Sequence, residues 1–255
     1  MARPFTRREF MMLAGGAAGM ACWSGARRAW PAGGVAPAVG PTEDPTEGPV
    51  VLFQGDSVTD GGRNRAITTA NTPAALGTGY PLLVASALLR ARPGRGYRFF
   101  NRGVSGDKVP DLGARWDADT LALRPDVVSV LVGVNDFWHK RLRGYTGTVA
   151  DFETGLADLL ARTRSALPTV RLVVVEPFVL RAGVVKNDWL SEFGERRAAA
   201  ARAARRAGAT FVAMQRAFDE LSARQAPEYW AADGVHPTPA GHAVIAERWR
   251  EGVAL

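Results

Sequence analysis

Five short apolar runs, each almost free of interruption, constrain the fold of this chain more than any other feature of its sequence. A strand with one solvated face would alternate apolar and polar residues, so continuous runs of this length predict strands that are buried on both faces. The five predicted strands are Val50–Gln54, Tyr97–Asn101, Asp126–Val132, Val170–Glu176 and Thr210–Ala213.

Helical patterns separate these runs. The predicted helices are Pro81–Arg92, roughly Val109–Ala122, Val149–Leu167, Leu190–Ala207 and Pro239–Trp249, the last with Thr238 as its N-cap. Strands that alternate with helices over short links predict βαβ units and one parallel sheet, which is an α/β fold. In such sheets ligands bind at the carboxyl ends of the strands, so the residues just after each strand are the candidates for a site.

Composition limits the kind of protein. The chain has 255 residues, of which 47% are hydrophobic, enough for one sizeable core without a second domain. Much of the formal net charge of +7 comes from five arginines among residues 1–38. The other arginines are scattered among alanines without an aromatic-interleaved basic stripe, which argues against a nucleic-acid partner.

The first residues predict an export signal. Thr6-Arg7-Arg8-Glu9-Phe10-Met11-Met12 resembles the twin-arginine signal, and the mildly apolar segment Leu13–Trp23 is too short to span a bilayer. We expect a signal peptide over residues 1–38, a flexible linker rich in Pro, Gly and Thr over residues 39–49, and one domain over residues 50–255. This organisation predicts export by the twin-arginine route to the periplasm or the medium, without a stable membrane span.

Cys22 is the only cysteine. The residues before it, Gly19-Met20-Ala21, lack the leucine that a lipoprotein box carries three positions upstream, which argues against lipid anchoring. Removal of the signal leaves no thiol, so the mature protein is expected to have no disulfide, no Cys-zinc site and no cysteine nucleophile. We expect no metal and no cofactor.

A candidate nucleophile follows the first predicted strand, at Ser57 in Gly55-Asp56-Ser57. A serine hydroxyl is a poor nucleophile at neutral pH unless a base, normally histidine, accepts its proton. Among the three histidines His139, His236 and His242, we choose His236, which has an acid three residues before it, Asp233, on a tight loop shaped by Gly234 and Pro237. Asp233 can bind Nδ1 of His236 and direct Nε2 toward the serine, so we predict a Ser57–His236–Asp233 triad.

Acyl transfer also needs hydrogen-bond donors for the oxyanion that develops on the substrate. The loops after the second and third predicted strands contain Gly103 and Asn135. We expect the backbone N–H groups of Ser57 and Gly103 and the side-chain amide of Asn135 to form this oxyanion hole.

These blocks, taken in order, resemble the SGNH or GDSL-type hydrolase superfamily. The matching blocks are Gly55-Asp56-Ser57 with Thr59-Asp60, Gly103 within Asn101–Gly106, Gly133-Val134-Asn135-Asp136, and Asp233-Gly234-Val235-His236-Pro237. The resemblance covers about residues 50–250. It implies a three-layer α/β/α, flavodoxin-like fold with a five-stranded parallel sheet, and a metal-free Ser-His-Asp ester hydrolase. The first block reads Ser-Val-Thr where Ser-Leu is usual, and Thr59 distinguishes it from the G-x-S-x-G elbow of α/β-hydrolases.

A narrower resemblance is to bacterial SGNH carbohydrate esterases that remove acetyl groups from xylan and xylo-oligosaccharides. It rests on the segments Asp60-Gly61-Gly62-Arg63, Leu76-Gly77-Thr78-Gly79-Tyr80, Gly133–Trp138 and Glu176-Pro177-Phe178. It implies that Tyr80, Trp138 and Trp230 shape an acetyl pocket or stack on sugar faces. The expected substrate is a short-chain, acetyl ester of a small molecule or oligosaccharide.

Two other functions remain open from the sequence. The same triad serves lysophospholipases, lipases and thioesterases, although the polar segment over residues 66–79 is a poor candidate for an apolar lid. A non-catalytic glycan-binding protein on this fold is the second alternative, and the complete triad argues against it. The absence of a G-x-G-x-x-G or Walker-type loop argues against a nucleotide-binding protein. The sequence favours no particular oligomeric state.

Overall fold

The structure is a computed structural model that describes residues 48–255. The predicted signal peptide, Cys22 and the predicted linker up to residue 47 lie outside the described residues. Among residues 48–255 no helix combines the length and the apolar character needed to cross a bilayer.

A five-stranded, fully parallel sheet forms the centre of the fold, in the order β2-β1-β3-β4-β5. The strands are β1 (Val50–Gly55), β2 (Arg98–Asn101), β3 (Val127–Leu131), β4 (Arg171–Val175) and β5 (Thr210–Val212). All five predicted strands are confirmed. The first strand, β1, lies in the interior of the sheet, with β2 on one side and β3, β4 and β5 on the other, so the strand order reverses between β1 and β3.

Ten helices accompany the sheet in the described part of the chain. They are α1 (Ser57–Asp60), α2 (Pro73–Leu76), α3 (Tyr80–Ala91), α4 (Val109–Asp119), α5 (Val134–Arg143), α6 (Val149–Ala166), α7 (Asn187–Arg206), α8 (Gln215–Ser222), α9 (Pro227–Trp230) and α10 (Pro239–Gly252), with short 3-10 turns at Pro93–Arg95 and Leu121–Leu123. The five predicted helices correspond to α3, α4, α6, α7 and α10. Thr238 caps α10 as predicted, because its side chain accepts a hydrogen bond from the Gly241 N–H.

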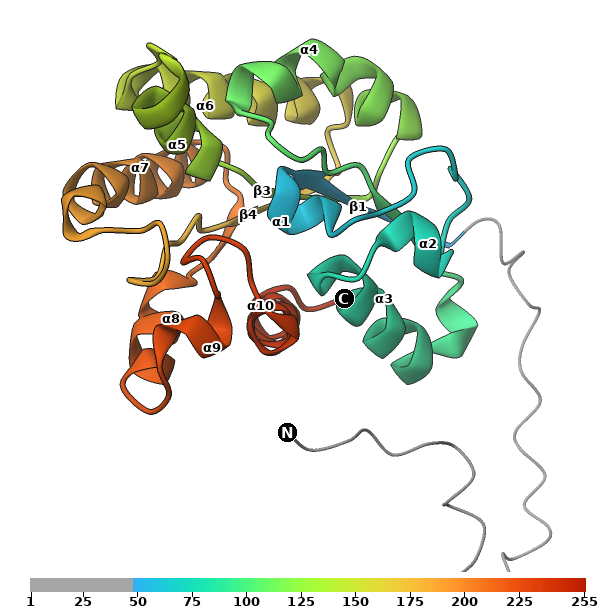
Figure 1. Cartoon of the computed structure of the whole chain (residues 1–255). Helices are drawn as coiled ribbons and strands as arrows, with labels where there is room; N and C mark the ends of the chain where they lie inside the picture. The colour runs from blue at the N-terminus through green and yellow to red at the C-terminus, as the bar shows by residue number, and fades with distance from the viewer. Residues whose placement is uncertain (1–47) are drawn as a thin grey trace, which may run out of the picture. The chain divides into compact units, whose positions relative to one another are not determined.

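The helices form two layers, one on each face of the sheet (Figure 1). Successive strand residues point to opposite faces, so Val51 and Phe53 pack toward α3 and α10, whereas Leu52 packs toward α4, α6 and α7. The fold is therefore the expected three-layer α/β/α sandwich with a flavodoxin-like strand order.

Aromatic side chains tie the end of the chain to its beginning. The Phe53 ring lies 5.5 Å from Trp249 of α10 and 5.6 Å from Tyr80 of α3, measured between ring centroids. Trp249 is fully buried, and its Nε1 donates to the Ser129 hydroxyl at 2.9 Å, which satisfies its only polar group. This packing places α10 and the loop before it next to the residues that follow β1.

Candidate active site

The candidate nucleophile is the first residue of a one-turn helix at the carboxyl end of β1. Asp56 caps this helix, because its side chain accepts a hydrogen bond from the Val58 N–H at 3.1 Å. Gly61 ends it in the left-handed region, at φ 52°. Ser57 thus sits at the point where the strand order reverses, at the edge of the sheet that binds ligands in folds of this class.

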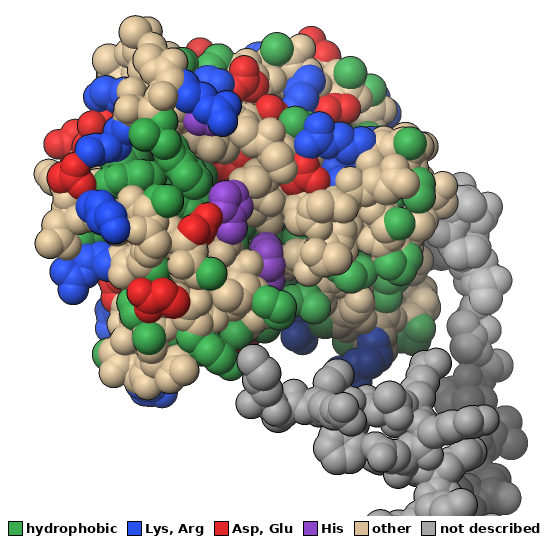
Figure 2. Space-filling model, in the orientation of Figure 1, with side chains coloured by type: hydrophobic (Ala, Val, Ile, Leu, Met, Phe, Trp, Pro, Cys, Tyr) green, Lys and Arg blue, Asp and Glu red, His purple; other side chains and the backbone are tan. Residues whose placement is uncertain are grey.

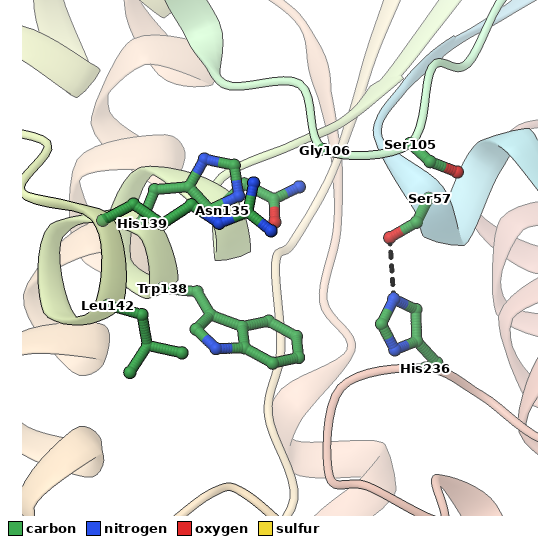
Figure 3. A pocket seen from close by; sticks show the side chains of 9 residues that line it. Ser57, Ser105, Gly106, Asn135, Trp138, His139, Leu142 and His236 are labelled. Atoms are coloured by element: carbon green, nitrogen blue, oxygen red, sulfur yellow. Dashed lines mark hydrogen bonds between the residues drawn. The ribbon is translucent and has the colours of Figure 1, made fainter.

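Three side chains from the two ends of the domain form a continuous line of hydrogen bonds. Ser57 Oγ lies 2.9 Å from His236 Nε2, and His236 Nδ1 lies 2.6 Å from Asp233 Oδ2 (Figure 3 shows the first contact). An imidazole in this position can take the hydroxyl proton, while the carboxylate holds the proton on Nδ1. The structure therefore brings together the three residues of the predicted triad.

The loop that carries Asp233 and His236 is fixed by hydrogen bonds to its own backbone and by close packing at a glycine. Asp233 Oδ1 accepts the N–H groups of Val235 and His236 at 2.9 and 2.7 Å. Gly234 adopts φ 86°, and a Cβ there would lie 2.5 Å from the Leu180 carbonyl oxygen. Only glycine fits this turn, which aims the imidazole across the cavity at Ser57.

Asp233 remains ionised in this setting. Its partial burial alone would raise the pKa, but the hydrogen bonds from His236 Nδ1 and from the two backbone N–H groups outweigh burial and lower it. The imidazole is 45% exposed, so His236 can exchange protons with solvent and substrate.

An open cavity of about 400 Å³ lies over Ser57 and His236. Its lining residues are Ser57, Ser105, Gly106, Asn135, Trp138, His139, Leu142, Arg143 and His236. Helix α5 forms the wall opposite the serine, and Trp138 stands between this wall and His236 (Figure 3). The Trp138 and His236 rings are 5.9 Å apart, so Trp138 helps to fix the imidazole as well as shape the cavity.

Two of the three predicted oxyanion-hole residues lie at this cavity. Asn135 is 5% exposed, and one N–H of its amide donates to the Asp107 carbonyl at 3.2 Å, which leaves the other N–H for a ligand. The Ser57 backbone N–H is the first of α1 and has no acceptor within the helix.

Gly103 does not belong to the cavity, and this part of the prediction is wrong. Its N–H donates to Asn101 Oδ1 at 2.8 Å, and the residue does not line the cavity. A Cβ at Gly103 would lie 2.4 Å from the backbone nitrogen of Asp60, so glycine is required there because two backbone segments touch.

Gly106, three residues further along the same loop, takes the place expected for Gly103. It lines the cavity beside Ser57, adopts φ 91°, and its N–H has no acceptor among residues 48–255. The sequence Gly103-Val104-Ser105-Gly106 contains two glycines, and sequence reasoning chose the one whose N–H is already bonded.

Of the three aromatic residues predicted to bind substrate, only Trp138 lies at the cavity. Tyr80 is fully buried, and its hydroxyl pairs with Thr59 Oγ1 at 3.1 Å. Trp230 lines a separate cavity of about 570 Å³ formed by α8, α9 and α10. The predictions for Tyr80 and Trp230 are therefore wrong, because the Tyr80 ring is buried in the core and Trp230 lines a different cavity.

The other two histidines have different surroundings. His242 accepts the Tyr80 backbone N–H on its Nδ1 at 3.2 Å, and burial, followed by the charge of His236, lowers its pKa to about 4. It is thus a neutral acceptor that joins α10 to α3. His139 lies on the cavity wall, where burial and then the charges of Arg143 and Lys108 lower its pKa.

Two buried carboxyl groups lie beneath the site. Burial, together with the nearby charge of Asp136, raises the pKa of Asp56 to about 7, although the hydrogen bond from the Val58 N–H opposes this. Burial also raises the pKa of Asp136 to about 6, although the Val109 N–H and Arg196 oppose this. Asp56 lies against an apolar cluster that includes Val58, Leu131 and Val134, where an ionised carboxylate is poorly solvated.

We expect an Asp56→Asn substitution to make folding less sensitive to pH. The pKa of Asp56 in the folded state is above its ordinary value, so the folded protein holds this proton more tightly than the unfolded chain does. The free energy of unfolding of wild type is therefore higher at pH 4, and it falls as the pH rises toward 7. Asparagine can cap α1 without a charge, so the stability of the variant relative to wild type should increase by about 3 kcal/mol from pH 4 to pH 8. Urea unfolding at both pH values measures this, and a difference that stays constant with pH would contradict it.

Within residues 48–255, no group of three or more His, Cys, Asp or Glu side chains is arranged to hold a metal ion.

Comparison with known proteins places this geometry in a family. The sequence profile of the GDSL-like lipase/acylhydrolase family matches residues 53–244. An acetylxylan esterase from Geobacillus stearothermophilus is 33% identical over 204 residues, which cover 78% of this chain and 91% of that protein. Its crystal structure superposes with a TM-score of 0.74 at 31% identity, covering 82% of this chain and 97% of the other.

A GDSL-like lipase candidate from Parabacteroides merdae has a similar structure, with a TM-score of 0.79, 40% identity, and coverage of 83% of this chain and 98% of that one. The family profile and this level of identity agree with the sheet order and with the hydrogen-bonded serine at the end of β1. The chain therefore belongs to the GDSL-like lipase/acylhydrolase family and is a serine ester hydrolase.

Proposed function

We propose that this hydrolase removes acetyl groups from xylan-derived oligosaccharides, with Ser57 as nucleophile, His236 as general base and acid, and Asp233 as the group that orients His236. The observation that carries the proposal is the unbroken Ser57–His236–Asp233 hydrogen-bond line at the floor of an open cavity of about 400 Å³. The similarity to an acetylxylan esterase supports the substrate class.

In the first half of the reaction, Ser57 Oγ attacks the acetyl carbonyl carbon while its proton moves to His236 Nε2. The carbonyl oxygen gains negative charge, which is stabilised by the N–H groups of Ser57 and Gly106 and by the free amide N–H of Asn135. His236 then gives the proton to the sugar oxygen as the ester C–O bond breaks. The deacetylated sugar departs, and the acetyl group remains bound to Ser57 Oγ.

In the second half, water takes the position of the sugar. His236 accepts a proton from the water as the water oxygen attacks the acetyl carbon, and the same three N–H donors hold the oxyanion. The proton returns through His236 to Ser57 Oγ as the acyl bond breaks, and acetate leaves. Asp233 keeps its charge throughout and stabilises the imidazolium in both halves.

A lipid-type ester is the second candidate, and one observation favours it. Leu142 lines the cavity with Trp138 and is 69% exposed, so its apolar side chain is free to contact a longer acyl chain. Acyl-chain length therefore separates the two functions.

The test measures acid release from acetylated xylo-oligosaccharides and from 4-nitrophenyl esters of two to twelve carbons, using residues 39–255. The proposal predicts acetate release from the oligosaccharide and a preference for acetyl over longer aryl esters. A preference for long acyl chains, with no release from the oligosaccharide, would replace it with the lipid function.

We also propose that the enzyme is exported by the twin-arginine route and acts outside the cytoplasm. The proposal is supported by the Arg7-Arg8 segment and by the apolar stretch that follows it. Esterase activity assayed separately in the medium, the periplasm and the cytoplasm tests this, and activity confined to the cytoplasm would refute it.

A further inference from the structure

An arginine without a carboxylate partner lies on the wall of the candidate active-site cavity. Arg143 is in the last turn of α5 and lines the same cavity as Ser57 and His236. Among residues 48–255, no Asp or Glu lies within ion-pair distance of it, and its side chain makes no hydrogen bond to a protein group.

The neighbouring cations differ from Arg143 in this respect. On the same helix, Lys140 pairs with Glu192 at 2.8 Å and Arg141 pairs with Asp188. Lys108, the other cation close to His139, is bound to Asp111. Each of these charges is balanced by an acid of the protein, whereas that of Arg143 is not.

The acids around the cavity do not balance Arg143 either. Asp233 is committed to His236 and to two backbone N–H groups. His139, which lies beside Arg143, is kept neutral because burial and then Arg143 itself lower its pKa. The cavity wall thus presents one uncompensated positive charge to a ligand.

The position of Arg143 along α5 says which part of the substrate it faces. Asn135, which the proposed function assigns to the oxyanion hole, is near the start of the helix, and Arg143 is eight residues later, about 12 Å along the helix axis. An acetyl group is far shorter than this, whereas an attached sugar ring extends to such a distance. The cation therefore faces the alcohol part of the ester.

We infer that Arg143 binds a carboxylate on the saccharide, so that the enzyme prefers O-acetylated oligosaccharides that carry a uronic acid over neutral ones. This inference rests on the proposed function and specifies its substrate class. A guanidinium suits the task because it stays charged and its planar fork matches a carboxylate with two parallel hydrogen bonds. Trp138 and Leu142 on the same wall offer apolar surface to the sugar ring between the two ends.

The test compares kcat/KM for acetate release from two acetylated xylo-oligosaccharides of equal length, one with a glucuronic acid substituent and one without. Wild type should prefer the acidic substrate by about fivefold at low salt, and less at 0.5 M NaCl, because a partly exposed ion pair is screened. The preference should disappear in Arg143→Gln and be partly kept in Arg143→Lys.

Arg141→Gln is the matched control, since it removes the same charge from the same helix outside the cavity. It should keep the wild-type preference. Equal rates on the two substrates in wild type, or a preference that Arg143→Gln leaves intact, would overturn the inference while acetate release from the neutral oligosaccharide still supports the proposed function. No release from either oligosaccharide would overturn both.

A second measurement shows whether Arg143 binds a carboxylate on the saccharide or on the acyl part of the ester. If 4-nitrophenyl hemisuccinate is cleaved faster than 4-nitrophenyl acetate, and Arg143→Gln abolishes that advantage, then Arg143 binds the acyl part and the assignment to the saccharide is wrong. Equal or slower cleavage of the hemisuccinate supports the assignment.

Discussion

Replacing Ser57 with alanine is expected to lower kcat for ester hydrolysis by a factor of about 10⁴ or more. The hydroxyl is the only group at this position that can form the acyl bond, and its single side-chain partner is His236, at 2.9 Å. The folded state should be almost unaffected, because the α1 cap is made by Asp56 and not by Ser57. Acetate release and the melting temperature, measured on the same preparation, test both statements.

Ser105→Ala is the matched control for this variant. Ser105 lines the same cavity, but its hydroxyl donates to Asp60 Oδ2 at 3.0 Å and does not contact His236. We expect the activity of this variant to fall by no more than about tenfold, which corresponds to the free energy of about one hydrogen bond. A fluorophosphonate probe should label Ser57 in wild type, and a Ser57→Ala enzyme within tenfold of wild type would show that another residue is the nucleophile.

Asp233→Asn is expected to lower kcat by about 10⁴ at neutral pH. The asparagine oxygen can still accept the Val235 and His236 N–H groups, so the loop should keep its shape. Its amide NH₂, however, would donate to His236 Nδ1 and force the proton onto Nε2, where the serine hydroxyl needs an acceptor. A large fall in kcat with little change in KM distinguishes this effect from a damaged cavity.

The control for Asp233 is an exposed acid that makes one salt bridge away from the cavity. Asp188→Asn removes the partner of Arg141 and should leave kcat close to that of wild type. If Asp233→Asn also stays within tenfold of wild type, Asp233 does not orient the base, and the short contact to Nδ1 is only structural.

The sheet could be predicted from the sequence because each strand is an uninterrupted apolar run. Such runs are typical of parallel strands covered on both faces. The links between them are long enough to contain the helices that connect parallel strands. The same reasoning located Ser57 and Asn135, since both follow strands directly and the carboxyl ends of parallel strands meet at one edge.

Helix α5 was missed, and with it most of the cavity wall. Its residues Val134–Arg143 have no long apolar stripe, because Phe137 and Trp138 are followed by a run of cations. Signals for this helix are nevertheless present. Basic residues in a last turn favour the helix dipole, and Gly144 ends the helix in the left-handed region, at φ 68°.

The errors at Gly103, Tyr80 and Trp230 share a physical origin. Sequence position says which residues are near the edge of the sheet, but not where a side chain or an N–H points. Tyr80 opens α3 with its ring against Phe53, and Trp230 closes α9 with its ring toward α10. Which of two neighbouring glycines keeps a free N–H depends on the Asn101 side chain, which no local pattern reveals.

The separation of Ser57 and His236 along the chain has a consequence for biosynthesis. The two residues are 179 positions apart, and His236 reaches the serine only when α10 packs against α3 and Phe53. A ribosome that has translated all five strands has therefore made a chain whose serine still lacks its base. Hydrolytic capacity arises only when the last helix emerges from the exit tunnel and docks, so premature termination before α10 is made yields a chain that lacks part of one helical layer and cannot hydrolyse esters.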